Sequence, residues 1–123
     1  MSVFLQINPS DYLFESNNYF VVYDRYPVTK GHTLIISKKP KTDFFMLSKE
    51  EQADLNEIVI KTKEYLDGLF KPDGYNIGMN CGEAAGQTIF HFHCHVIPRY
   101  NGDMSDPRGG VRHCVEGKGY YNP

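Results

Sequence analysis

The sequence lacks the features of two large classes of protein. Its 123 residues carry no excess of basic charge, with a formal net charge of −2, so we expect no nucleic acid polymer among its partners. It contains no apolar run long enough to span a bilayer, and its opening residues have neither a basic start nor a cleavage site. We therefore expect a cytoplasmic protein that does not bind membranes.

Paired cysteines and internal repeats are also missing. The three cysteines, Cys81, Cys94 and Cys114, form no Cys-x-x-Cys pair, and their odd number argues against a disulfide framework. We interpret them as buried or incidental thiols of a protein in a reducing compartment. The length suits a single domain spanning residues 1–123, and pairing with a second copy would help so small a domain to bury its surface. A homodimer is therefore expected.

Four segments have the pattern of β-strands. Residues 19–23 and 32–36 are rich in β-branched and aromatic side chains, and the short connection between them predicts an antiparallel pair. Residues 75–80 and 89–97 alternate apolar with small or polar side chains on either side of a glycine-rich connection. These four segments predict an antiparallel sheet, in which we expect about five strands in all.

One segment predicts a long helix. Ser48 and Glu51 form a capping-box pattern, and the apolar residues that follow recur at helical spacing as far as Phe70. Pro72 and Gly74 then end the helix. Strands, one long helix and further strands in that order favour an α+β fold with the helix covering one face of the sheet. From about residue 100 the chain is rich in glycine and proline, which predicts an extended tail packed on the domain or on a partner.

Three of the five histidines stand at alternate positions, His91, His93 and His95, with Phe92 and Cys94 between them. Because side chains on a strand point alternately to its two faces, the three imidazoles should share one face and the apolar residues the other. Three buried histidines would need several hydrogen-bond partners without any gain in packing. We therefore interpret this row of three histidines, called here the histidine ladder, as a functional site.

A metal site is an alternative interpretation, because His-x-His on a strand presents two nitrogen ligands of the kind that zinc prefers. No carboxylate or thiol stands on the same face of this segment to complete the ligand set. The nearby Asn80, Gln87 and Thr88 offer amides and a hydroxyl, which suit phosphate oxygens better than a transition metal. Residues 82–88 are small enough for backbone N–H groups to approach an anion, which suggests a phosphate-binding loop.

The segment from Gly86 to Ile97 resembles the signature of the histidine triad family, in which three histidines alternate with apolar residues. Asp24 and the Gly31-His32 pair followed by an apolar run also match, so the resemblance spans about residues 3 to 100. It implies the histidine triad fold, a purine nucleotide substrate and hydrolysis at the α-phosphate.

The resemblance also implies roles for individual residues. His93 would be the nucleophile, His91 and His95 would support it and contact phosphate oxygens, and His32 would be the fourth histidine of the site. Asp24 would bind the ribose hydroxyls. The phosphate would be held by Asn80, Gln87 and Thr88, and the apolar walls around the base would come from Phe4, Leu5, Ile7 and Val22.

The residues themselves support such chemistry. Imidazole is a good nucleophile near neutral pH, and a hydrogen bond that holds the proton on Nδ1, for example to a backbone carbonyl, leaves Nε2 free to attack phosphorus. The resulting phosphoramidate can be hydrolysed by water, and flanking histidines can stabilise the phosphoryl oxygens or protonate the leaving group. The chemistry requires no metal, although a divalent ion could accompany a polyphosphate substrate.

One departure from the family pattern and one further resemblance bear on function. Many members carry an N-terminal Cys-x-x-Cys that helps to bind a structural zinc, whereas residues 2–7 here contain no cysteine, so we expect no structural zinc site. The segment from Arg108 to Arg112 resembles the tail of short family members that hydrolyse dinucleoside polyphosphates, and its two arginines could bind distal phosphates, although an ordinary solvated tail is the alternative. His113 receives no role.

Dinucleoside polyphosphates such as diadenosine tetraphosphate are therefore the expected substrates. An adenosine phosphoramidate hydrolase, which cleaves AMP from an amine, would use the same histidines. A nucleotide-binding protein with weak turnover is a third interpretation, which the intact triad disfavours. A nucleotidyl transferase is disfavoured because that branch of the superfamily replaces the last histidine of the triad, and His95 is present.

Overall fold

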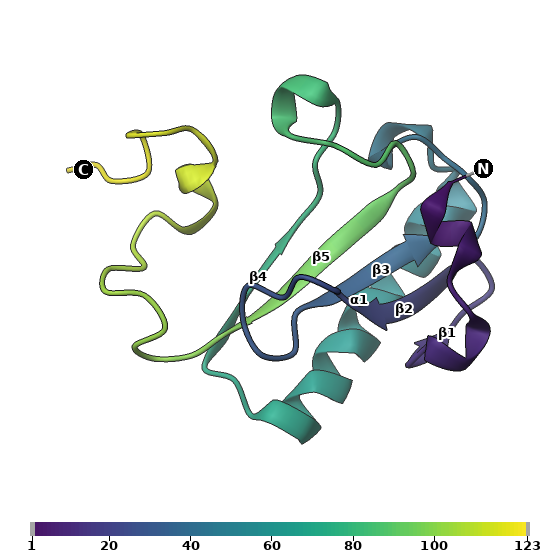
Figure 1. Ribbon diagram of the computed structural model, residues 1–123, viewed down its shortest axis with the longest axis horizontal. Helices are drawn as coiled ribbons and strands as arrows, with labels where there is room; N and C mark the ends of the chain where they lie inside the picture. The colour runs from purple at the N-terminus through teal and green to yellow at the C-terminus, as the bar shows by residue number, and fades with distance from the viewer. Residues whose placement is uncertain (1, 123) are drawn as a thin grey trace.

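The computed structural model describes residues 2–122. Within them the strands β1 (Phe14–Glu15), β2 (Tyr19–Tyr23), β3 (Thr33–Ser37), β4 (Gly74–Gly78) and β5 (His93–Arg99) form one antiparallel sheet in the order β1-β2-β3-β5-β4. One long helix, α1 (Lys49–Phe70), connects β3 to β4 and lies across the sheet (Figure 1). The predicted α+β fold with about five strands is confirmed.

The long helix begins where the sequence predicts. The Ser48 hydroxyl accepts a hydrogen bond from the Glu51 N–H at 3.1 Å, and the Glu51 carboxylate accepts one from the Ser48 N–H at 2.9 Å. This reciprocal cap satisfies two N–H groups that would otherwise lack partners at the start of the helix. Lys71, in the left-handed conformation at φ 50°, ends the helix. No helix within residues 2–122 is long and apolar enough to cross a membrane.

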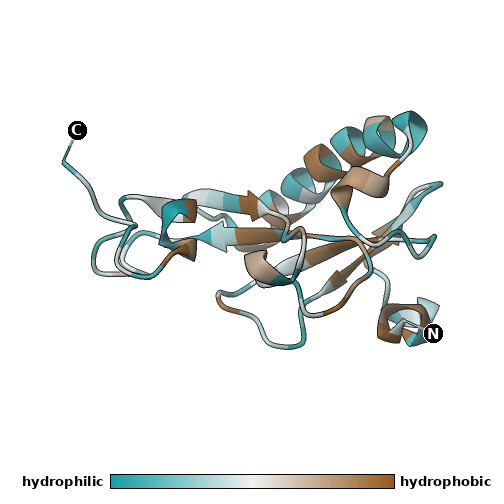
Figure 2. Ribbon diagram, turned by 90° about the horizontal axis from the view of Figure 1, so that it is seen from above, coloured by the Kyte–Doolittle hydropathy of each residue, from teal (hydrophilic) through white to brown (hydrophobic). Residues whose placement is uncertain are grey.

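The two faces of the sheet are covered by different segments. One face packs against α1 and forms the larger apolar cluster, which includes Val21, Ile35, Leu66 and Val96. The opposite face packs against the N-terminal 3-10 helix Val3–Gln6 and forms a smaller cluster around Phe4. Figure 2 shows the helix and the N-terminal segment on opposite sides of the sheet. The sheet is therefore the middle layer between a thick and a thin cover.

Several strand boundaries differ from the sequence-based expectations, and one strand was not expected. Strand β5 begins at His93 instead of residue 89, because the Phe92 N–H donates to the Lys41 carbonyl at 2.6 Å and so leaves the regular ladder. Strand β4 ends at Gly78, two residues earlier than expected. The short β1 has only two residues, too few to leave a periodic pattern, and was not predicted.

The C-terminal tail lies beyond the edge strand β4 (Figure 1) and is more ordered than its composition predicts. It contains the 3-10 helix Gly110–Cys114, and the His113 ring is 2.9 Å from the Arg108 carbonyl. The Tyr120 hydroxyl donates to the Asp106 carbonyl at 2.7 Å. Gly119 has no room for a side chain, because a Cβ would collide with the His113 ring. Hydrogen bonds between residues of the tail thus hold it in a folded arrangement.

Candidate active site

Strand β5 places His93 and His95 on the face of the sheet opposite the helix. Cys94 and Val96, which alternate with them, are buried in the cluster against α1, whereas the two histidines are half-buried. In the antiparallel register His95 pairs with Leu34 and His93 with Ile36. The histidines thus share a face with the smaller apolar cluster, in the alternation that the sequence predicts.

The His93 ring is oriented by the backbone of its own segment. Its Nδ1 is 2.9 Å from the carbonyl oxygen of His91. A carbonyl can only accept, so Nδ1 carries the proton and Nε2 of the neutral ring keeps its lone pair. The Phe4 ring packs edge-on against His93, with ring centroids 4.9 Å apart. The geometry leaves an unprotonated ring nitrogen on a half-buried histidine, as a nucleophile requires.

His91 occupies a different environment from the other two members of the ladder. Its side chain is 1% exposed, and its Nε2 is 2.6 Å from the carbonyl of Ser37, to which it donates. Its Nδ1 is buried without a hydrogen-bond partner, and burial lowers the pKa of the ring. The expectation that the His91 ring contacts phosphate oxygens does not match this geometry, because neither ring nitrogen is accessible. His91 instead supports His93 through its carbonyl.

Asp24, His32 and His95 form a compact polar cluster beside the ladder. Nε2 of His32 lies 2.9 Å from Nδ1 of His95, and one Asp24 carboxylate oxygen lies 3.4 Å and 3.9 Å from these two nitrogens. The other Asp24 oxygen accepts the Tyr26 N–H at 2.8 Å. The structure therefore brings together residues that are distant in the sequence, since Asp24 and His95 are 71 positions apart.

The two histidines of this cluster are held neutral by burial. Burial lowers the pKa of His32, against the opposing charge of Asp24. Burial, together with the neighbouring His93 and His32, lowers the pKa of His95 to about 4, against the opposing charge of Asp24. A buried imidazole resists protonation because the charged form loses its hydration. Both rings are therefore mainly neutral near pH 7, and they interact through a hydrogen bond and not through an ion pair.

The glycine-rich loop before the ladder is held in place by Gln87. The Gln87 side chain is 4% exposed; its oxygen accepts the Gly82 N–H at 2.8 Å, and its amide nitrogen donates to the carbonyls of Thr42 at 2.7 Å and Ile89 at 3.2 Å. Both polar ends of this side chain hydrogen-bond within the protein in this structure, and the phosphate contact expected of Gln87 stays a prediction. Gln87 shapes the loop. Asn80 and Thr88, near the two ends of the loop, are exposed and remain candidates for phosphate contacts.

The four residues expected around the base lie on the same face, with different exposures. Phe4 and Val22 are buried in the smaller cluster, and Ile7 is partly buried against it, whereas Leu5 is 39% exposed. Sequence reasoning did not single out Leu34 and Ile36, which belong to the same cluster. The signal was available, because positions 32, 34 and 36 alternate along the expected strand, so Leu34 and Ile36 had to share a face with His32.

The N-terminal segment offers no ligands for the structural zinc that many histidine triad proteins carry. Residues 2–7 contain no histidine, cysteine or acidic side chain, and the Phe4 ring lies against His91 with ring centroids 5.5 Å apart. These residues do not fit such a zinc site. Within residues 2–122 one group of three side chains, Asp24, His32 and His95, has potential ligand atoms within 4.8 Å of one another.

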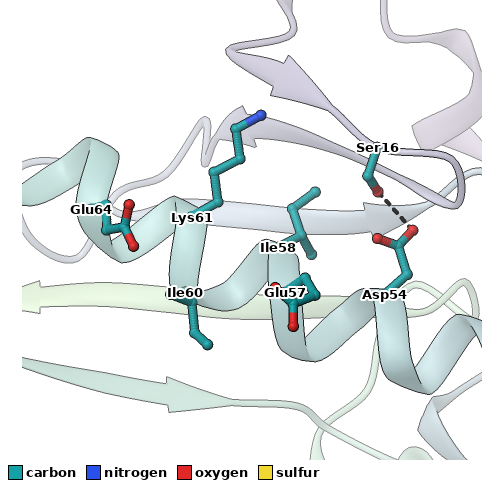
Figure 3. A pocket seen from close by; sticks show the side chains of 7 residues that line it. All are labelled: Ser16, Asp54, Glu57, Ile58, Ile60, Lys61 and Glu64. Atoms are coloured by element: carbon teal, nitrogen blue, oxygen red, sulfur yellow. Dashed lines mark hydrogen bonds between the residues drawn. The ribbon is translucent and has the colours of Figure 1, made fainter.

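In two other regions, the groove beside α1 and the C-terminal tail, charged side chains make contacts within the protein. A shallow groove beside α1 is lined by Asp54, Glu57 and Glu64 but by no histidine, and Asp54 accepts the Ser16 hydroxyl at 2.8 Å (Figure 3). This contact ties the turn after β1 to the helix. In the tail, Arg108 pairs with Asp106 at 2.9 Å, and Arg112 donates to backbone carbonyls and lies over the Tyr121 ring.

Comparisons with known proteins place these features in a family. The family model of the HIT domain matches residues 6–102. A HIT-like protein of Methanocaldococcus jannaschii is 40% identical over 95 residues, which cover 77% of this chain and 73% of that protein. An AP-4-A phosphorylase of Mycobacterium tuberculosis is 31% identical over 87 residues, which cover 70% of this chain and 45% of the phosphorylase.

Solved structures agree with these matches. The crystal structure of a HIT family protein from Bacillus anthracis has a TM-score of 0.76 and 32% sequence identity, and the match covers 99% of this chain and 79% of that one. The chain spans between 61% and 73% of the length of the first curated relatives. A family match that includes the whole histidine ladder, on the fold and geometry described above, shows that this chain belongs to the histidine triad (HIT) domain family.

Proposed function

We propose that this protein hydrolyses dinucleoside polyphosphates, such as diadenosine tetraphosphate, with His93 as the nucleophile. The single observation that carries the proposal is the 2.9 Å contact between His93 Nδ1 and the His91 carbonyl, which leaves Nε2 with its lone pair. The similarity to an AP-4-A phosphorylase supports a polyphosphate-linked nucleotide as the substrate class.

The proposed reaction has two displacements. In the first, His93 Nε2 attacks the α-phosphorus, an N–P bond forms, and the P–O bond to the leaving nucleotide breaks. In the second, water attacks the same phosphorus, the N–P bond breaks, and AMP is released while the histidine regains its neutral form. Dividing one difficult displacement into two easier ones is the advantage of a covalent intermediate.

His95 and its partners are proposed to stabilise the charge on the phosphoryl group. A neutral His95 that accepts a hydrogen bond from His32 at Nδ1 carries its own ring proton on Nε2, where it is a hydrogen-bond donor. Donors directed at developing negative charge stabilise a transition state strongly in a site with little water. Asp24 is proposed to bind a ribose hydroxyl as well as to face His32 and His95.

The nucleotide is proposed to lie across the face that carries the histidines. Exposed Asn80 and Thr88 would contact phosphate oxygens, and Val22, Ile7 and Phe4 would form apolar walls around a purine. A divalent ion could accompany the polyphosphate chain. A homodimer in the cytoplasm is the proposed setting.

Hydrolysis in oxygen-18 water tests the proposal. Purified protein, freed of metal by chelation, is incubated with diadenosine tetraphosphate, and the products are resolved by chromatography with mass detection. AMP plus ATP with the label in AMP is the expected result, because water enters at the α-phosphorus. Label found only in ATP, or two molecules of ADP, would contradict attack at that atom.

Adenosine phosphoramidate is the second candidate substrate, since its cleavage needs the same nucleophile and only a smaller leaving group. The tail arginines favour the polyphosphate only weakly, because both are engaged in contacts within the tail. Comparison of kcat/KM for the two substrates under the same conditions decides between them. Turnover of neither substrate, with tight AMP binding, would favour a nucleotide-binding protein.

A further inference from the structure

The ring of His32 receives a hydrogen bond from the backbone on one side and faces the Asp24 and His95 side chains on the other. The Val28 N–H donates to His32 Nδ1 at 3.1 Å. A ring nitrogen that accepts a hydrogen bond carries no proton, so the neutral ring has its proton on Nε2. That Nε2 lies 2.9 Å from His95 Nδ1 and 3.4 Å from the Asp24 carboxylate.

We propose that the Val28 backbone N–H fixes the tautomer of His32. The Asp24–His32–His95 cluster thereby donates a hydrogen bond toward the substrate, and its binding of a transition-metal ion is disfavoured. The inference rests on the proposed function for its substrate, but the tautomer itself does not. Val28 is a positioning residue in this scheme, acting through its main chain.

The distances within the cluster suit a metal ion. Zinc binds histidine nitrogen and carboxylate oxygen at about 2.0–2.2 Å, which places tetrahedral ligand atoms about 3.4 Å apart. The three separations here are 2.9, 3.4 and 3.9 Å. Two histidines and one carboxylate are also a common set of zinc ligands. Distance alone would therefore allow the site to capture zinc.

The hydrogen bond from Val28 opposes that outcome. To bind a metal through Nε2, His32 would have to carry its proton on Nδ1, and two N–H donors would then face each other across 3.1 Å. Histidines that bind metals usually donate their second ring N–H to a carboxylate or carbonyl, and loss of such a partner weakens metal binding about 10- to 100-fold. Here the partner is a donor, so the arrangement disfavours the metal-binding tautomer.

The same tautomer determines where the proton of His95 lies. Since His32 Nε2 donates to His95 Nδ1, the neutral His95 ring holds its proton on Nε2. One backbone N–H thus sets the proton positions of two rings in sequence. The donor that results is the one that the proposed reaction needs at the phosphate.

The segment that carries the Val28 N–H is fixed at several points. The Thr29 hydroxyl donates to the Pro98 carbonyl at 2.6 Å, and the Tyr100 hydroxyl donates to the Lys30 carbonyl at 2.7 Å. Gly31 has φ 89°, and a Cβ there would lie 2.9 Å from the Phe70 ring. The Val28 side chain is 68% exposed, so the position of its N–H depends on the loop and not on the side chain.

Nitrogen NMR of the wild-type protein tests the tautomer directly and needs no substrate. Long-range proton–nitrogen correlation spectra distinguish protonated from unprotonated ring nitrogens, and His32→Gln and His95→Gln assign the signals. We expect Nδ1 of both His32 and His95 to be unprotonated, and Nδ1 of His93 to carry a proton. A proton on His32 Nδ1 would overturn the inference, whether or not the protein hydrolyses the proposed substrate.

Metal binding in a matched pair of variants tests the consequence. Val28→Pro removes the N–H, and Val28→Ala retains it. Cobalt(II) titration, followed by its absorption bands, is expected to show affinity about 10-fold or more higher for Val28→Pro than for Val28→Ala and wild type. The Val28→Ala spectra should keep the wild-type tautomers. Equal cobalt affinities in folded Val28→Pro and Val28→Ala, or stoichiometric cobalt binding by His32 and His95 in the wild type, would contradict the proposal.

Discussion

The two faces of the sheet are built from the same strands but bury different kinds of atoms. The face under α1 buries a continuous apolar cluster to which β2, β3 and β5 all contribute. The opposite face has a smaller apolar cluster and also buries His32 and His91, each satisfied in part by a backbone group. Burial therefore stabilises the first face through packing, and it orients polar side chains on the second.

This difference separates stability from chemistry. Because buried polar groups cost free energy unless they are hydrogen-bonded, the histidine face is held in one arrangement by its backbone partners. The helix face contains no group that the proposed reaction uses. Changes on the first face should alter mainly the free energy of unfolding, and changes on the second should alter mainly turnover.

The largest expected effect comes from removing the proposed nucleophile. His93→Ala should reduce kcat by about 10⁴-fold or more, since a covalent route depends on that group. The free energy of unfolding should change by only about 1 kcal/mol, because the side chain loses one hydrogen bond. Single-turnover kinetics and denaturant titration measure the two quantities. His113→Gln, a change of histidine in the tail, serves as the control and should retain turnover.

A cavity on the helix face should have the opposite signature. Leu66 is fully buried against the sheet, so Leu66→Ala should destabilise the fold by about 2–5 kcal/mol. Turnover per folded molecule should stay near the wild-type value. Leu69→Ala on the same helix is the matched control, because Leu69 is 57% exposed and its loss should change stability by about 0.5 kcal/mol or less. Equal effects of the two leucines would argue against the packing described.

Acid should destabilise the histidine face. Burial holds the pKa values of His32, His91 and His95 below the ordinary value of 6.5, that of His95 at about 4. Below pH 6.5 the unfolded chain therefore binds more protons than the folded one, so the free energy of unfolding falls as the pH drops from about 6.5 toward 4.

The size of this loss follows from the same values. A tenfold difference in proton affinity corresponds to about 1.4 kcal/mol, so His95 alone accounts for a loss on the order of 2–3 kcal/mol. Urea titrations at several pH values measure it, and the double variant His32→Gln/His95→Gln should have a flatter profile. An unchanged slope in that variant would assign the acid sensitivity to other groups.

The smallest effect is expected at the start of the helix. Ser48→Ala removes the hydroxyl that caps the Glu51 N–H and should cost about 1 kcal/mol. Turnover should not change, because Ser48 caps the N-terminus of α1, and α1 contributes no residue to the proposed site. Thermal unfolding is a sufficient measurement. Ser105→Ala, at an exposed position in the tail, provides the reference for a serine outside such a cap.

The sequence predicted features that have a local signature. The capping box at Ser48 and Glu51 fixed the start of α1, and the alternation around His93 predicted which side chains share a face of β5. The family followed from the same ladder, and the comparisons confirm it. These features depend on residues a few positions apart, so periodicity was sufficient to find them.

Contacts between residues that are distant in the sequence were not predicted. His91 follows the alternation but leaves the strand, because its Nε2 donates to the Ser37 carbonyl, 54 residues away. The Gln87 side chain has donor and acceptor groups that suit a phosphate, and in this structure its amide nitrogen donates to the Thr42 carbonyl. The Val28 N–H left no signal at all, since backbone donors are present at every residue except proline. Partners of this kind become visible only once the fold is known.

The stereochemical course at the α-phosphorus is the most direct test of the central claim that His93 forms a covalent intermediate. A dinucleoside polyphosphate made chiral by sulfur at the α-phosphorus is hydrolysed in oxygen-18 water, and the configuration of the labelled product is determined. Two successive displacements each invert the centre, so the account predicts net retention, even if the intermediate never accumulates. Net inversion would mean that water attacks directly, and it would contradict the account.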